Sequence, residues 1–229
     1  MRIWIKAAVA VLVLGGLLVG ADRIALNVAE GQAADRLAGR QGLSGKPSVT
    51  IEDFPFLTDL LSRKVDRVKL SADSVQLTGG GRTFQLSDFS ARLTGVQVGD
   101  DDRSATVDSG AGSGRISYQQ AHDLLGLDGR SSLGYGGPGR LKVTVEVLGQ
   151  KVSTTVKLRT EGNKVLVDSV GDVPGVGSLP GVSTMVSSAI GSHSFALDGM
   201  PVGLDLSEVN PQADGLSLAF QGTKVQLVG

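Results

Sequence analysis

The sequence predicts an α+β protein dominated by long antiparallel strands, and three observations support this. Apolar and polar residues alternate through much of the chain after residue 65, which is typical of strands with one buried face. The 33 glycines are scattered among Val, Leu, Ser and Thr, which favours many strands joined by tight turns. A few segments carry the spacing of short amphipathic helices, which we expect to cover the apolar face of the sheet.

The amino terminus has the features of an export segment. Arg2 and Lys6 precede an apolar and small-residue run from Ala7 to Ala21, which ends at Asp22. The two cations would hold the amino end in the cytoplasm and place the rest of the chain outside. We expect residues 22–229 to form one domain on the periplasmic side of the cytoplasmic membrane, anchored by residues 7–21. The alternative is that residues 1–21 are a signal sequence that is removed.

Residues 22–40 are predicted to form a helix. Its apolar stripe is expected to consist of Ala25, Ala29, Ala33 and Leu37, with Ile24 and Val28 beside them. Two of the six Phe then flank Pro55 in the segment IEDFPFLTDLLS. We expect SVTIEDF to be a strand, Pro55 to set a bend, and FLTDLLSRK to form two helical turns. The side chains expected on one side of these turns are Phe56, Leu57, Leu60 and Leu61.

Strands are predicted from Val65 onward, with a bulge at Ser87-Asp88, where the alternation changes phase. SATVDSGAGSGRISY is expected to be a strand, YQQAHDLLGL a helix and DGRSSLGYGGPG a flexible loop. RLKVTVEVL and KVSTTVKLRT are expected to form a hairpin linked by Gly149-Gln150, and EGN to turn into KVLVDSV. VSTMVSSAIG is predicted to be a short helix. The chain is expected to close with GLSLAFQ, a turn at Gly222-Thr223, and KVQLV.

Composition and motifs argue against several classes of function. The net charge of −1 removes the main electrostatic reason to expect nucleic-acid binding, and the chain has no Cys and two His. Asp100, Asp101 and Asp102 are consecutive, whereas a calcium loop spaces its ligands at alternate positions, so we expect no metal. GYGGPG lacks the following helix of a nucleotide site, and G-x-S-x-G is absent. We therefore expect neither a cofactor nor an enzyme.

A family resemblance adds to this interpretation. VTIEDFPFLTDLLSRKVDRVKLSADSV, FSARLTGVQV, GRISYQQAHDLLGL and MPVGLDLSEVNPQADGLSLAFQGTKVQL resemble, in order and spacing, the LmeA-like phospholipid-binding proteins of actinobacterial cell envelopes. Asp53 stands where that pattern usually has Gly, and Asp59 where it often has Gln. The resemblance implies a long curved antiparallel sheet wrapping amphipathic helices, similar to the tubular TULIP-type lipid carriers. It also implies binding of an anionic phospholipid such as phosphatidylinositol, in support of envelope lipoglycan biogenesis.

The apolar residues expected to contribute to a lipid groove follow from this resemblance and from the strand pattern. They are Phe54, Phe56, Leu57, Leu60, Leu61, Val68, Leu70, Phe84, Leu86, Phe89, Leu93, Leu124, Leu125, Met185 and Ile190. The cations expected to meet phosphate headgroups are Arg63, Lys64, Arg67 and Lys69.

Alternatives stay open at this stage. The apolar strand faces are also what a plain core requires, and Phe54 and Phe56 fit either core or groove. The cations fit a solvated strand edge equally well. The alternative function is a structural or assembly module that contacts envelope glycosyltransferases without carrying lipid.

Overall fold

The computed structural model describes residues 2–38, 43–44, 47–79, 81–99, 104–147, 149–170, 194–198 and 200–228, and the side chains of the first helix from Leu14 onward. The elements are α1 (Arg2–Ala38), β1 (Leu43–Ser44), β2 (Ser48–Ile51), α2 (Phe56–Ser62), β3 (Lys64–Gly79), β4 (Arg82–Val98), β5 (Ser104–Ile116), α3 (Tyr118–Leu124), β6 (Ser131–Tyr135), β7 (Leu141–Val147), β8 (Gln150–Glu161), β9 (Lys164–Val170), β10 (Ser194–Asp198), β11 (Val202–Gln212) and β12 (Gly215–Val228). The predicted helix VSTMVSSAIG lies outside the described residues.

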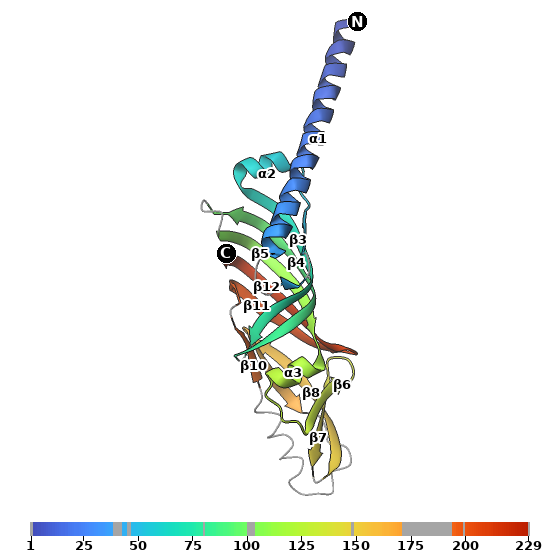
Figure 1. The fold of residues 1–229 in the computed structure, drawn as a ribbon, viewed down its shortest axis with the longest axis vertical. Helices are drawn as coiled ribbons and strands as arrows, with labels where there is room; N and C mark the ends of the chain where they lie inside the picture. The colour runs from blue at the N-terminus through green and yellow to red at the C-terminus, as the bar shows by residue number, and fades with distance from the viewer. Residues whose placement is uncertain are drawn as a thin grey trace.

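One antiparallel sheet dominates the fold, so the predicted α+β class is confirmed (Figure 1). Its strands follow the order β11-β12-β5-β4-β3-β10-β9-β8-β7-β6, and β1 and β2 also pair with β3. The sheet curves until its two ends approach each other. There the amide of Leu206 on β11 donates to the carbonyl of Gly162, beyond β8, at 3.2 Å. The result is a nearly closed, barrel-like sheet with few helices.

The first helix is one continuous element from Arg2 to Ala38, and its amino-terminal part projects beyond the sheet (Figure 1). It contacts β2, α2 and β1 at one side of the sheet. Among the described residues, where the side chains of α1 begin at Leu14, no helix is long and apolar enough to cross a membrane. The apolar run expected to be an anchor begins at Ala7, ahead of the first described side chain.

The predicted apolar stripe of this helix is wrong by about one residue. Asp22, Leu26 and Ala34 are the buried positions, whereas Ile24 and Val28 are 68% and 53% exposed. Glu30 lies on the buried line too, and its Oε1 accepts a hydrogen bond from the amide of Ile51 on β2 at 2.7 Å. Hydropathy cannot find this face, because two of its four members are carboxylates that accept hydrogen bonds.

The two short helices form where they are expected. Helix α2 ends at Arg63, which has a φ of 52° and whose amide donates to the carbonyl of Asp59. Helix α3 begins with a capping box, in which the amide of Gln120 donates to Ser117 Oγ and the amide of Ser117 donates to Gln120 Oε1.

Two predicted loops are strands instead. Ser131–Tyr135, predicted as part of a flexible loop, forms β6 because it pairs with β7 and places Leu133 against the core. Gly222-Thr223, predicted as a turn, lies inside β12, since both residues pair with β5. The buried positions of β12 change phase between Phe220 and Val225, where Lys224 has a φ of 53°.

The other strand predictions hold with small shifts. The predicted bulge at Ser87-Asp88 is confirmed by a register shift between Ser87 and Ser90, with Asp88 at a φ of 51°. The turn before Lys164 is confirmed by its pairing with Glu161. The β7–β8 link comes one residue earlier than predicted, because Val147 pairs with Gln150.

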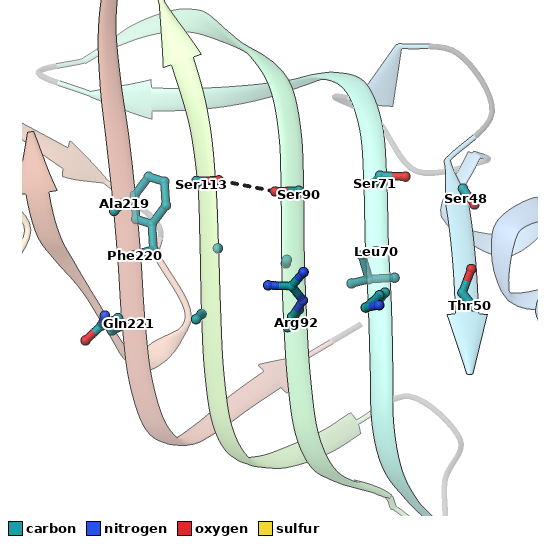
Figure 2. Close-up of a pocket in the computed structure, with 14 residues that line it drawn as sticks. Ser48, Thr50, Leu70, Ser71, Ser90, Arg92, Ser113, Ala219, Phe220 and Gln221 are labelled. Atoms are coloured by element: carbon teal, nitrogen blue, oxygen red, sulfur yellow. Dashed lines mark hydrogen bonds between the residues drawn. The ribbon is translucent and has the colours of Figure 1, made fainter. Parts of the chain in front are cut away.

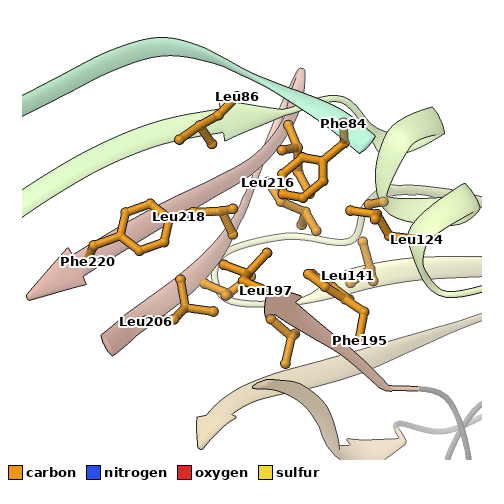
Figure 3. Close-up of a cluster of buried hydrophobic side chains, with 14 of the residues drawn as sticks. Phe84, Leu86, Leu124, Leu141, Phe195, Leu197, Leu206, Leu216, Leu218 and Phe220 are labelled. Atoms are coloured by element: carbon orange, nitrogen blue, oxygen red, sulfur yellow. The ribbon is translucent and has the colours of Figure 1, made fainter. Parts of the chain in front are cut away.

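The hydrophobic core lies where the long strands face the shorter half of the sheet (Figure 3). Side chains from β4, β5, β11 and β12 meet those of β7 to β10 and α3. Its buried members are Phe84, Leu86, Ile116, Ala121, Leu124, Leu141, Val143, Val156, Val165, Phe195, Leu197, Leu206, Val209, Leu216, Leu218 and Phe220. The ends of β3 to β5 that lie toward α2 contribute no side chain to this core (Figure 1).

Candidate functional site

An apolar cavity of about 240 Å³ lies at the edge of the core. It is lined from β3, β4, β5, β11, β12 and the segment before β11. The lining residues are Leu70, Val75, Leu77, Leu86, Phe89, Ala91, Leu93, Gly110, Ala111, Gly112, Met200, Pro201, Leu204, Phe220 and Val225. Leu86 and Phe220 belong to the core as well, so the cavity begins where the core ends.

Alternate glycines on β5 let neighbouring groups lie close to the strand beside the cavity. Gly110, Gly112 and Gly114 follow each other at every second residue, so they share one face of the strand. At Gly114 the Leu86 side chain fills the place of the missing side chain, within 2.7 Å of an added Cβ. At Gly110 and Gly112 an added Cβ would lie 3.3 Å from Leu93 Cδ2 and from the Ser90 carbonyl oxygen, which is a tight contact, so these two glycines let β4 lie close against β5. A strand glycine often marks such a close approach by another group.

The structure brings together some of the residues predicted to line a groove. Leu70, Leu86, Phe89 and Leu93 all line the cavity. Phe84 and Leu124 are buried in the core, and Leu125 packs against it. Val68 is half-buried and lies outside the cavity lining. For all of these residues, contact with lipid stays a prediction.

The residues predicted around the bend separate into two environments. Phe56 is buried, with 2% of its surface exposed, and Leu57 is half-buried. Phe54 and Leu61 are 65% and 88% exposed, so they point away from the protein interior. The side chain of Leu60, together with Met185 and Ile190, lies outside the described part of the structure.

Several lining residues were missed by the sequence-based prediction. They are Val75, Leu77, Ala91, Gly110, Ala111, Gly112, Met200, Pro201, Leu204, Phe220 and Val225. The glycines at every second position of GAGSG, residues 110–114, are the sequence pattern that could have indicated the site. This segment also resembles the G-x-S-x-G motif of lipases loosely. Met200 and Leu204 reach the site only through long-range strand pairing, which a single sequence does not reveal.

The opposite face of the same strands is polar (Figure 2). Ser90 and Arg92 alternate with Ala91 along β4, and Ser90 Oγ lies 3.2 Å from Ser113 Oγ on β5. With Ser48, Thr50 and Ser71 they line a shallow hollow away from the core. The sheet therefore has one face suited to hydrocarbon and one suited to water or polar groups.

The four cations predicted to meet headgroups lie near α2 and the start of β3. Lys69 forms an ion pair with Glu52, and its hydrogen bond lowers the pKa of that carboxyl. Arg67 lies 3.6 Å from the carboxylate of Asp53. Asp53 is buried and accepts hydrogen bonds from the amides of Asp66, at 2.6 Å, and of Arg67, at 3.0 Å. Part of this charge is thus already neutralised within the protein.

Helices α1 and α2 are joined by a buried carboxylate. Asp22 is 2% exposed; its Oδ1 accepts a hydrogen bond from the amide of Leu57 at 2.8 Å, and its Oδ2 pairs with Arg23 at 2.6 Å. Burial alone would raise the pKa of Asp22, but the Leu57 amide and Arg23 outweigh it and hold that pKa below its ordinary value. The Arg23 guanidinium also lies 5.1 Å from the centre of the Phe54 ring.

A group with the composition of a catalytic triad occurs at the end of α3. His122 Nε2 lies 3.2 Å from Ser131 Oγ, and His122 Nδ1 lies 3.2 Å from Asp123 Oδ1. The Ser131 hydroxyl, however, donates to the carbonyl of Asp128 at 2.8 Å, and Nε2 lies 3.0 Å from the same oxygen. An Nε2–H that donates there cannot accept the serine proton, so this geometry ties the helix end to β6 rather than activating a nucleophile.

Metal binding finds no support in the described residues, where no group of three or more His, Asp or Glu side chains is placed to hold an ion. The apolar cavity is therefore the candidate functional site of the described residues. It offers shape and hydrocarbon contact, and no titratable side chain lines it.

Comparison with known proteins agrees with this chemistry. No curated protein and no solved structure matches the chain. The model of one protein family, described as LmeA-like phospholipid-binding, matches residues 20–221, a range that includes α2, the core and all of the cavity lining except Val225. The chain belongs to the LmeA-like phospholipid-binding family.

Proposed function

We propose that this protein is a non-enzymatic phospholipid-binding protein that holds acyl chain in the cavity between β3, β4, β5, β11 and β12. The observation that carries the proposal is an apolar cavity at the edge of the core, in a family described as phospholipid-binding. Acyl chains need apolar area rather than directed hydrogen bonds, and each buried methylene contributes about 0.8 kcal/mol. An anionic phospholipid such as phosphatidylinositol is the proposed ligand.

The size of the cavity limits how the lipid is held. Its volume of about 240 Å³ is below the roughly 300–1,000 Å³ of typical small-molecule sites. We therefore infer that part of an acyl chain enters and that the headgroup stays outside. The curved antiparallel sheet supports a likeness to TULIP-type carriers, in which such a groove runs along the sheet.

The proposed location is the periplasmic side of the cytoplasmic membrane. The support is the sequence Arg2 to Ala21, with two cations followed by an apolar run that α1 carries as a continuous helix. In this position the protein would support the biogenesis or transport of envelope lipids, including lipoglycans.

The alternative is an assembly module that contacts envelope glycosyltransferases and carries no lipid. The filled core and the small cavity favour this second function, since a dry interior would need no ligand. The two functions differ in whether lipid reaches the cavity.

Photocrosslinking of the full chain distinguishes them. The protein is reconstituted in vesicles containing phosphatidylinositol with a diazirine in its acyl chain, and crosslinked peptides are identified by mass spectrometry. We expect crosslinks on β4, β5 and β12 around Ala91, Gly112 and Phe220. Crosslinks confined to α1 would reject the carrier function and favour the assembly module.

A matched pair of variants sharpens the test. Ala91→Phe places a ring in the cavity, whereas Ala219→Phe adds the same ring on β12 beside the polar hollow. We expect the first variant to lose the cavity crosslinks and the second to keep them.

A further inference from the structure

A second surface of the molecule is unusually apolar. Ten large apolar or aromatic side chains are exposed in the described residues, and eight of them belong to α1 or to the segment Phe54–Leu61. Two of these eight are Phe54, which lies just before α2, and Leu61, which lies within α2. Figure 1 shows α1 and α2 together at the end of the sheet from which α1 projects. Exposed apolar residues concentrated in this way mark an interaction surface.

We propose that α2 docks on the lipid bilayer from which α1 emerges, with Phe54 and Leu61 inserted at headgroup level. This inference rests on the membrane location in the proposed function and adds a second contact with the bilayer. The occupant of the surface is therefore a membrane, not a protein partner.

The length of α1 places α2 at the right depth. At 1.5 Å per residue the anchor, residues 7–21, spans about 22 Å, and Ile3 to Ile5 extend it to about 28 Å, because a Lys near the end of a span can keep its charge among the headgroups. This length matches the roughly 30 Å hydrocarbon layer of a bilayer. Asp22 would then lie at the membrane surface. Because Asp22 Oδ1 accepts a hydrogen bond from the amide of Leu57 at 2.8 Å, α2 is held at the same level.

Continuity of the apolar surface supports the same occupant. Leu14, Leu17, Leu18 and Val19 are 46–66% exposed on the turns of α1 that precede Asp22. The Arg23 guanidinium lies against the Phe54 ring and donates to the carbonyl of Asp53 at 3.3 Å, so a cation borders the apolar group. An aromatic ring beside a cation is typical of the membrane interface.

Docking through this surface depends on apolar insertion more than on charge. The cations around α2 are matched by acids, as in the pairs Arg23–Asp22, Arg67–Asp53 and Lys69–Glu52. The contact should therefore resist salt, unlike a polybasic surface.

Docking also fixes the distance of the cavity from the membrane. Helix α2 leads into β3, and the cavity residue Leu70 lies six positions after Lys64 along this strand, which corresponds to about 20 Å. A lipid leaving the bilayer would meet Phe54 and Leu61 first and then follow the inner face of β3 to the cavity.

Site-specific fluorescence in the full chain tests the proposal, and the absence of Cys makes single labelling straightforward. Ser62→Cys reports on α2, Leu18→Cys on α1, and Ser132→Cys on an exposed position of β6 at the far end of the molecule (Figure 1). Each variant carries a nitrobenzoxadiazole dye and is reconstituted in vesicles of phosphatidylcholine and phosphatidylglycerol with spin-labelled lipids. We expect the Ser62 dye to be quenched by a headgroup-level spin label, the Leu18 dye by a deep one, and the Ser132 dye by neither.

Leu61→Asp then removes the apolar contact without moving the dye. We expect it to reduce quenching of the Ser62 dye, while Val202→Asp, which changes another exposed apolar residue, on β11, leaves it unchanged. Quenching that persists in Leu61→Asp, or that disappears at high salt, would overturn apolar docking.

The combined quenching of the Leu18 and Ser62 dyes separates loss of docking from loss of the membrane location. A quenched Leu18 dye with an unquenched Ser62 dye would show that α2 stands clear of the membrane, and the surface would then fit a protein partner. An unquenched Leu18 dye would reject the membrane location together with the docking. Crosslinking in the cavity reports on lipid binding separately, so failure of docking and failure of lipid binding are distinguishable.

Discussion

The Oδ1 of Asp22 accepts a hydrogen bond from the backbone amide of Leu57 at 2.8 Å, across 35 positions of sequence. Through this bond the middle of α1 satisfies an orphan amide in the first turn of α2. A side chain of α1 thus performs the task that an N-cap residue would normally perform, since Pro55 makes no side-chain capping bond. The orientation of α2 relative to α1 therefore depends on one buried carboxylate.

Replacing Asp22 with Asn should remove a pH-dependent part of the stability. The carboxyl has a lowered pKa in the folded protein, so protonation favours the unfolded chain. The stabilisation is present above the unfolded pKa of about 3.9 and is lost as pH falls through the lower folded pKa. Thermal unfolding of the full chain in mild detergent should show a larger difference between wild type and Asp22→Asn near neutral pH than at about pH 3.

Asp22→Ala serves as the control for the hydrogen bond itself. Asn can still accept from Leu57, whereas Ala leaves that amide without its partner. We expect Asp22→Ala to melt at a lower temperature than Asp22→Asn at every pH. A difference between wild type and Asn that does not change with pH would contradict the role of the charge.

Replacing Gly114 of β5 should lower the free energy of unfolding for a purely steric reason. Gly114→Ala would place a Cβ against Leu86, which is 1% exposed and cannot move without disturbing the core. We expect this variant to lose about 1–3 kcal/mol of the free energy of unfolding, as overpacked cores do. Denaturant unfolding of the full chain measures the change.

Gly134→Ala is the matched control, because Gly134 also lies in a strand but has no neighbouring atom within 4 Å of an added Cβ. It should be neutral, or stabilising by up to about 1 kcal/mol through the unfolded state. Equal losses in both variants would mean that strand propensity, rather than contact with Leu86, decides the outcome.

Strand alternation was enough to predict much of the sheet. Where one face is buried and the other solvated, as in β4, the period of two is visible in the sequence and even the bulge at Asp88 can be found. Helix α1 shows where hydropathy fails, because the buried Asp22 and the half-buried Glu30 face the protein for their hydrogen bonds. Gly222-Thr223 resembles a turn locally, and only pairing with β5 makes it a strand.

The candidate site was predictable only in part. Leu70, Phe89 and Leu93 could be found because they lie on the apolar faces of long strands. Nothing in their own segments separates them from Phe84, which lies in the filled core, since that distinction depends on what faces them across the sheet. Cavity and core share one pattern, and the partner strands decide between them.

The His122 group should contribute stability and no catalysis. Ser131→Ala removes the hydroxyl that donates to the Asp128 carbonyl, and His122→Gln removes the ring beside it. Each variant should lose about 0.5–1.5 kcal/mol, as expected for an intramolecular hydrogen bond, and should crosslink phospholipid as wild type does. Hydrolysis of phosphatidylinositol that is present in wild type and lost in both variants would contradict this and indicate a hydrolase.

Phe56 and Leu61 both follow the bend at Pro55, yet they differ sharply in burial. Phe56→Ala should cost about 3–5 kcal/mol, since it empties a site where the ring is 2% exposed. Leu61→Ala should change the free energy of unfolding by no more than about 0.5 kcal/mol, because that side chain is 88% exposed. Denaturant unfolding in mild detergent measures both. If Leu61→Ala were as costly as Phe56→Ala, Leu61 would pack inside the folded protein, and it could not reach the bilayer surface without breaking that packing.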